Sequence, residues 1–160
     1  MSTPPVPNTN ENTIRAGNLP VRQTATHIFF GYQGPDLEHY MMYCKALLFG
    51  DGVVAKKILA AKTPGEAKTL GRQAGSFDQK KWDGACDGVV ERGNFLKFSQ
   101  NPELKDILLG TGTKIIVEAS PSDRIWGVGF DAENAEGREE EWGANKLGKA
   151  LMRVRSTLQG

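Results

Sequence analysis

Glu38 and Lys45 lie seven residues apart in a segment with helical periodicity. Seven residues make about two turns of an α-helix, so the two side chains share one face. That face adjoins Met41 and Met42, and apolar neighbours disfavour the ionised form of a carboxyl group, which suits it to proton transfer near neutral pH. The spacing therefore indicates a catalytic pair. It also fits a solvated helix face with a surface ion pair.

Lys68 and Arg72 are four residues apart and would also share one helix face, with Gly71 beside them. Two converging cations bind a phosphate group well, and a glycine lets a ligand approach the backbone closely. These residues therefore indicate a phosphate site. The alternative is an exposed basic face on a helix that ends near Gly71.

Trp82 and Trp126 are candidates for an aromatic wall. Tryptophan offers the largest flat surface for stacking on a base or a similar planar ring, and it is equally at home in a hydrophobic core. The sequence leaves both interpretations open.

Several reaction classes lack their signature residues in this chain. Cys44 and Cys86 have neither the spacing of a zinc site nor that of a disulfide framework. The sequence holds no P-loop, no Gly-x-Ser-x-Gly elbow and no His-Glu-x-x-His motif. Gly127-Val128-Gly129 does not open a helix with a third glycine, as a dinucleotide site requires. We expect neither a metal nor a cofactor.

Length and charge narrow the class of protein further. The chain has 160 residues, which suits one domain, and its 20 Lys and Arg against 19 Asp and Glu give a formal net charge of +1. This balance argues against binding that depends on many phosphates of a long nucleic acid. No apolar run approaches the roughly 18 residues of a membrane span. We expect no membrane partner and a cytoplasmic protein, or a nuclear one in a eukaryotic cell, and no oligomeric state follows from these features.

Apolar periodicity and turn residues predict the elements that would position the candidate side chains. Thr63, Pro64 and Glu66 form a helix start signal, and Asp78 is the expected cap of the following helix. Residues 1–26, rich in Pro, Ser, Thr and Asn, are predicted to form a flexible polar arm before a domain over 27–160. Helices are expected over 36–50, 63–73, from 78 onward, 101–110 and 142–158, and strands over 27–30, 114–118 and 125–130.

An ordered set of short matches resembles the NADAR family, also called the YbiA-like family. The set covers about His27 to Leu158, and its order is more specific than any single piece. The matching residues are Glu38-His39-Tyr40-Met41-Met42, Lys45-Ala46, Asp51, Ala67-Lys68, Leu70-Gly71-Arg72, Trp82, Lys97-Phe98, Gln100-Asn101, Leu104, Thr111-Gly112, Val117-Glu118-Ala119, Asp123, Trp126-Gly127-Val128-Gly129, Asn145, Leu147-Gly148 and Leu151-Met152.

The resemblance implies an α+β fold, a single compact and mainly helical domain with a small sheet. It also implies an N-glycosidase that breaks the bond between an amino nitrogen and a phosphorylated ribose. A carboxylate would stabilise the cationic sugar, and Glu38 is expected in that role, with Lys45 holding it ionised or attacking the sugar carbon. The residues expected to bind substrate are Lys68, Gly71, Arg72, Trp82, Glu118, Asp123, Trp126 and Gly127.

Within this set, Lys68 and Arg72 would hold phosphate, the two tryptophans would wall the pocket, and Asp123 would bind ribose hydroxyls. Glu118 is a second candidate carboxylate, or else a buried ion-pair partner of Lys97 or Arg72.

Three functions remain open at this point. The first is removal of ADP-ribose from guanine bases of nucleic acid, with ADP-ribose or ADP-ribosylated guanine as the bound partner. The second is hydrolysis of riboflavin-biosynthesis intermediates. The third is a non-catalytic ADP-ribose or nucleotide reader, suggested because Gly34-Pro35 runs directly into Asp36-Leu37-Glu38 where family members carry a longer loop.

Overall fold

The computed structural model describes residues 22–30 and 35–160, and of residues 30 and 35–38 only the backbone. The chain forms a mostly helical α+β domain with one small sheet. In chain order the elements are β1 (Arg22–Gln23), β2 (His27–Phe30), α1 (Pro35–Leu48), α2 (Gly52–Ala60), α3 (Pro64–Gly71), α4 (Gln79–Gln100), α5 (Pro102–Gly110), β3 (Ile115–Glu118), a short 3-10 helix (Glu139–Glu141) and α6 (Lys146–Gln159).

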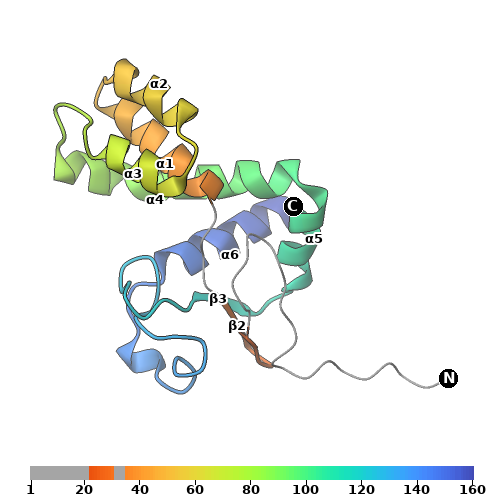
Figure 1. Ribbon diagram of the computed structural model, residues 1–160. Coiled ribbons are helices and arrows are strands. Elements are labelled where there is room, and N and C mark those ends of the chain that lie inside the picture. Colours follow the sequence, from red (N-terminus) through yellow and green to blue (C-terminus); the bar gives the residue numbers. More distant parts are fainter. Residues whose placement is uncertain (1–21, 31–34) are drawn as a thin grey trace.

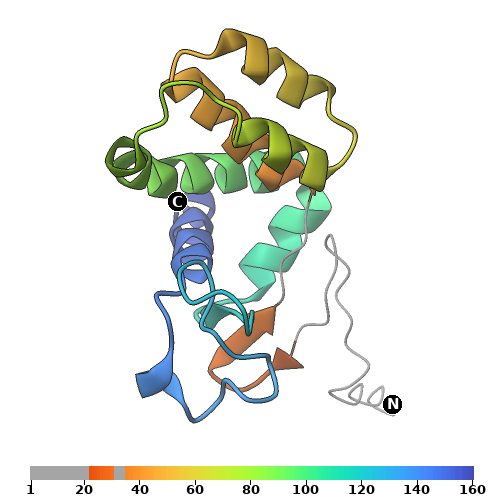
Figure 2. The same ribbon diagram turned by 60° about the vertical axis from the view of Figure 1, so that its left-hand side comes forward.

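The long helix α4 divides the molecule into two parts (Figure 1). On one side α1, α2 and α3 pack together around a core of small and aliphatic residues. On the other side lie α5, α6 and the sheet, and a second core joins these elements to α4. The view in Figure 2 shows the same division, with α4 between the two groups. We call residues 45–82, which comprise the last turn of α1, α2, α3 and the linker to the start of α4, the helical lobe.

Local capping explains where the helices of this lobe begin. The hydroxyl of Thr63 accepts a hydrogen bond from the N–H of Glu66 at 3.1 Å, and Pro64 occupies the first turn of α3. Asp78 caps α4 by accepting from the N–H of Lys81 at 2.7 Å. Both caps were predicted, and both are confirmed.

The sheet has the order β1-β2-β3. β1 pairs with β2 in antiparallel fashion, whereas β2 and β3 are parallel, with Phe30 opposite Glu118. Because parallel strands end at the same edge of a sheet, Glu118 lies beside the point where β2 leads toward α1. The predicted strands over 27–30 and 114–118 are therefore confirmed.

Two predictions about the elements were wrong. Residues 52–60 form α2, although Gly50 and Gly52 marked the end of a helix and no new one was expected before Thr63. Residues 125–130 form no strand: their carbonyls accept from the 143–147 segment, as in the bonds from Lys146 N–H to Ile125 and from Leu147 N–H to Trp126. The predicted last helix, 142–158, starts at Lys146.

The predicted N-terminal arm lies largely outside the described residues. Within it, Arg22–Gln23 form β1, so the described structure begins before His27. The boundary between arm and domain stays a prediction. Among the described helices, none is both long and apolar enough to cross a membrane.

Candidate active site

Glu118, the last residue of β3, is held in place through its backbone. The side-chain amide of Asn145 accepts a hydrogen bond from the N–H of Glu118 at 3.0 Å and donates one to the carbonyl of Ile116 at 2.9 Å. The carbonyl of Glu118 accepts from the N–H of Val128 at 3.0 Å. The end of β3 is thus fixed on both sides by residues distant in the sequence.

The carboxyl group of Glu118 is buried, with 7% of the residue exposed. Its Oε2 atom has no hydrogen-bond partner among the described residues. Burial, and secondarily the charge of Asp123, raise the pKa of Glu118 from its usual value to about 7. A carboxyl group with such a pKa exchanges its proton near neutral pH, which is the property of a general acid or base.

Asp123 and Gly127 shape the turn that follows Glu118. Asp123 Oδ1 accepts hydrogen bonds from the N–H groups of Ile125 at 2.9 Å and Trp126 at 2.8 Å. A Cβ atom on Gly127 would lie 2.9 Å from the carbonyl oxygen of Glu118 and 3.0 Å from that of Asp123. Gly127 therefore has a packing reason to be glycine. The predicted roles of these two residues in binding substrate stay predictions.

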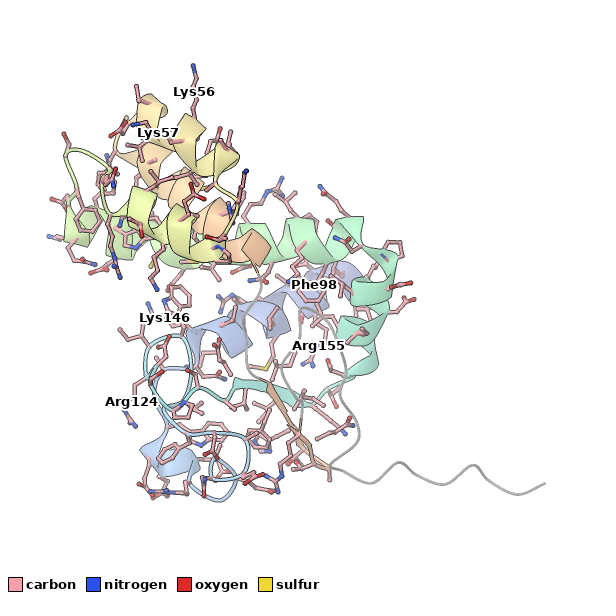
Figure 3. The ribbon with its side chains drawn as sticks, viewed as in Figure 1. Lys56, Lys57, Phe98, Arg124, Lys146 and Arg155 are labelled. Atoms are coloured by element: carbon pink, nitrogen blue, oxygen red, sulfur yellow. The ribbon has the colours of Figure 1, made fainter. Side chains whose placement is uncertain are left out.

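Trp126 is half-buried at the edge of the core that contains Ile116. It also lines a surface pocket of about 230 Å³ together with Asp87, Lys146 and Arg153. Lys146, labelled in Figure 3, begins α6. Its Nζ atom lies 5.6 Å from the centroid of the Trp126 ring and 3.0 Å from Asp87 Oδ1 on α4. Trp126 thus both packs against the core and lines a pocket, so both interpretations offered by the sequence, a core residue and a pocket wall, apply to it.

Lys45 and Trp82 meet where α1 crosses the start of α4. Lys45 Nζ lies 4.4 Å from the centroid of the Phe77 ring and 5.9 Å from that of Trp82. Glu38 lies in α1 two turns before Lys45, but its side chain lies outside the described residues. The structure therefore brings Lys45 and Trp82 together and leaves the pairing of Glu38 with Lys45 as a prediction.

Lys68 of α3 and Arg72, the residue that follows α3, are exposed, and neither forms an ion pair with a side chain that the structure describes. Gly71, between them, is buried against α1, and a Cβ atom there would clash with Sδ of Met42. Gly71 thus allows α3 to approach α1 closely. A direct contact of Gly71 with substrate stays a prediction, as does phosphate binding by the two cations.

The two groups of candidate residues are connected through the core that joins α4, α5, α6 and the sheet. Ile116 and Glu118 are two residues apart on β3 and so point to the same face. Met41 of α1 and Trp126 both pack against the core cluster that contains Ile116. This core therefore links α1, which carries Lys45, to the turn that carries Trp126, while α1 itself packs on α2, α3 and α4.

Comparison with known proteins shows the family of this chain. The sequence profile of the NADAR domain matches residues 15–159. The chain belongs to the NADAR domain family.

Relatives of this NADAR protein include N-glycosidase R617 of Acanthamoeba polyphaga mimivirus, which is 50% identical over 124 residues, covering 76% of this chain and 73% of the viral protein. The maize riboflavin biosynthesis protein PYRR, a chloroplastic protein, is 34% identical over 133 residues, covering 79% of this chain and 20% of that protein. The solution structure of YbiA from E. coli has the same fold, with a TM-score of 0.65, 26% identity, and coverage of 91% of this chain and 92% of that one.

Sequence reasoning missed two residues of this NADAR site. From the sequence, Asn145 is only one of the residues that match the family. Nothing near it in the sequence indicates that its hydrogen-bond partners lie 27 and 29 residues away. Phe77 stands in a linker without periodicity, and only the fold places its ring against Lys45. Among the described residues, no group of three His, Cys, Asp or Glu side chains is arranged to hold a metal ion.

Proposed function

We propose that this NADAR protein is an N-glycosidase that removes ADP-ribose from guanine bases of nucleic acid. The observation that carries the proposal is Glu118, a buried carboxyl group with a pKa of about 7 and one oxygen without a partner among the described residues. A relative at 50% identity is named an N-glycosidase, which supports the reaction class.

The reaction breaks the bond between C1 of the ribose and an amino nitrogen. The leaving nitrogen takes up a proton, C1 becomes cationic, and water adds to it. Glu118 can supply or accept the proton near neutral pH, since about half of such a group is protonated at a pH equal to its pKa.

A carboxylate close to C1 stabilises the cationic sugar, and that role is assigned to Glu38. Lys45 holds Glu38 ionised, or its amine attacks C1 as the bond from C1 to the protonated leaving nitrogen breaks. In the second case Lys45 loses a proton, the ribose ring opens to give an imine, and water hydrolyses the imine to release the sugar and the lysine amine. The faces of the Phe77 and Trp82 rings lie 4.4 Å and 5.9 Å from Lys45 Nζ and attract its ammonium group, which supports the role in which Lys45 acts as a cation.

The remaining candidates suit the rest of the substrate. Lys68 and Arg72 are exposed cations that would bind the diphosphate of ADP-ribose. Trp82 and Trp126 would form walls for the planar parts, and Asp123 would bind ribose hydroxyls through Oδ2, since Oδ1 already accepts two backbone N–H groups. A reducing compartment suits the free thiols of Cys44 and Cys86, and a cytoplasmic or nuclear location remains part of the proposal.

Two other functions have an observation in their favour. The name of the maize relative, a riboflavin biosynthesis protein, favours an N-glycosidase acting on riboflavin-pathway intermediates. The direct run from Pro35 to Glu38 favours a reader that binds ADP-ribose without turnover.

One experiment separates the three. The protein is incubated with ADP-ribosylated guanosine, with the phosphoribosylated riboflavin precursor, and with free ADP-ribose, and products and binding are measured. Release of ADP-ribose from guanosine, lost in Glu38→Gln and unchanged in Glu103→Gln on α5, supports the proposal. Turnover of the riboflavin precursor alone, or binding of ADP-ribose with no turnover, contradicts it in favour of the second or third function.

A further inference from the structure

The net charge of +1 includes two regions of opposite charge, which we call the two poles of the protein. The helical lobe, residues 45–82, contains eight Lys or Arg against three Asp or Glu. The segment 131–141, on the far side of the molecule beyond the sheet, contains six Asp or Glu against one Arg. Each pole thus carries an excess of five charges, and the two cancel only in the total.

Most cations of the lobe form no ion pair with a described carboxylate. The four ion pairs among the described residues, those of Arg22, Arg138, Lys146 and Arg153, all lie outside the lobe. Seven exposed cations of the lobe form no ion pair within the described chain; they are Lys56, Lys57, Lys62, Lys68, Arg72, Lys80 and Lys81. Lys56 and Lys57 stand at the end of the lobe farthest from the sheet (Figure 3). A bound polyanion would reduce the mutual repulsion of these seven cations.

An exposed aromatic ring of the lobe lies beside Lys45, a residue of the candidate active site. Phe77 is 44% exposed, and its ring centroid lies 5.2 Å from that of Phe49 and 4.4 Å from Lys45 Nζ. An apolar ring of this exposure is available for stacking on a base.

The linker that carries Phe77 is held in an unusual conformation. Ser76 has a φ of +56°, in the left-handed region that few residues other than glycine adopt. The N–H of Gly75 donates to Asp51 Oδ2 at 3.1 Å, which ties the linker to the start of α2. Strain of this kind persists where the surrounding structure imposes it, and here it accompanies the outward placement of Phe77.

We propose that the helical lobe binds single-stranded nucleic acid next to the active site. Phosphates of the strand contact the unpaired lysines, a base next to the modified guanine stacks on Phe77, and the acidic 131–141 segment repels the strand at the other end of the molecule. This inference rests on the proposed function and adds that the guanine is recognised within a strand. The exposed cations bind the phosphates of DNA and RNA alike.

Binding of fluorescently labelled, unmodified single-stranded DNA and RNA is measured by anisotropy over a series of salt concentrations. We expect binding that weakens with salt, with a slope that falls by about 0.7 for each lysine reversed in the Lys56→Glu/Lys57→Glu variant. Phe77→Ala should weaken binding about tenfold, and Phe77→Trp should retain it. Lys105→Glu on α5, outside the lobe, is the control and reverses the charge of one lysine. Because Lys105 is expected to contact no phosphate, this variant should bind the oligonucleotide within about twofold of the wild-type affinity.

Equal weakening by Lys105→Glu, or no effect of the lobe variants, would overturn the inference. Tighter binding of duplex DNA, of an acidic protein or of anionic lipid vesicles than of single strands would overturn it too. Turnover of ADP-ribosylated guanosine by a protein that binds no oligonucleotide would sink this inference and leave the proposed function standing. Oligonucleotide binding that depends on the lobe, without turnover of ADP-ribosylated guanosine, would contradict the proposed function and leave the binding surface standing.

Discussion

Asn145 fixes the backbone of Glu118 from 27 residues away, with its Oδ1 atom 3.0 Å from the N–H of Glu118. Its Nδ2 atom donates to the carbonyl of Ile116 on the same strand, and both Asn145 and Glu118 are buried. One amide side chain thus sets the position of the carboxyl group on which the proposed chemistry depends.

Replacing Asn145 by alanine should destabilise the fold. The change leaves the N–H of Glu118 and the carbonyl of Ile116 buried without partners, and we expect the free energy of unfolding to fall by about 2–4 kcal/mol. Denaturant unfolding measures it. Asn134→Ala, which removes an exposed amide that donates to Asp131 three residues earlier, is the matched control and should cost less than about 0.5 kcal/mol. Equal stabilities of the two variants would contradict this account of Asn145.

Glu118 should make stability depend on pH. Its pKa in the folded protein, about 7, lies above the 4.5 of an ordinary glutamate, so between these values the folded protein binds more protons than the unfolded chain. Stability from this group is fully present below pH 4.5 and is lost as the pH rises through 7, a change of about 3 kcal/mol at most. Unfolding curves between pH 4.5 and 8 measure the loss, and Glu118→Gln should remove it. A Glu118→Gln variant with the same pH dependence as the wild type would show that another group titrates.

A substitution at Gly71 tests whether this residue is needed for the packing of α3 on α1 or for substrate binding. In Gly71→Ala the new methyl group meets Met42 Sδ, and we expect a loss of about 1–3 kcal/mol in stability from overpacking. Because the clash is with α1, the KM of the folded variant should stay unchanged, and Met42→Ala should restore part of the stability. A raised KM with unchanged stability would instead place Gly71 against the substrate.

Much of the helical framework could be predicted from the sequence because its signals are local. The cap formed by Thr63 and the cap formed by Asp78 depend on residues within three positions, and both appear in the structure. α2 was missed because Gly50 and Gly52 mark a break, although Asp51 between them starts the next helix by accepting from the N–H of Val54. A short break between two helices and the end of a helix look alike in sequence.

The partner of β3 could not be predicted from local pattern. Residues 125–130 alternate as a strand does, yet Gly129 has a φ of +79° and Gly127 lies against the backbone of Glu118, so the segment turns instead of extending. The raised pKa of Glu118 likewise depends on burial by elements far along the chain. Family resemblance supplied the candidate list, and only the fold shows which members lie together.

Lys68 and Arg72 should matter for substrate and not for stability. Both side chains are exposed, so alanine at either position should change the free energy of unfolding by less than about 0.5 kcal/mol. If each donates a charge-assisted hydrogen bond to phosphate, each substitution should raise the KM for ADP-ribosylated guanosine about tenfold. Steady-state kinetics with Lys105→Ala as control measures the effect. An unchanged KM in both variants would remove them from the phosphate site.

The central claim is that Glu118 moves a proton as the bond between ribose and nitrogen breaks. Single-turnover release of ADP-ribose from ADP-ribosylated guanosine, followed from pH 5 to 9 in the wild type and in Glu118→Gln, tests it most directly. We predict a wild-type rate that changes with an apparent pKa near 7 and a variant at least about 100-fold slower without that titration. A folded Glu118→Gln protein that releases ADP-ribose at the wild-type rate would contradict the claim.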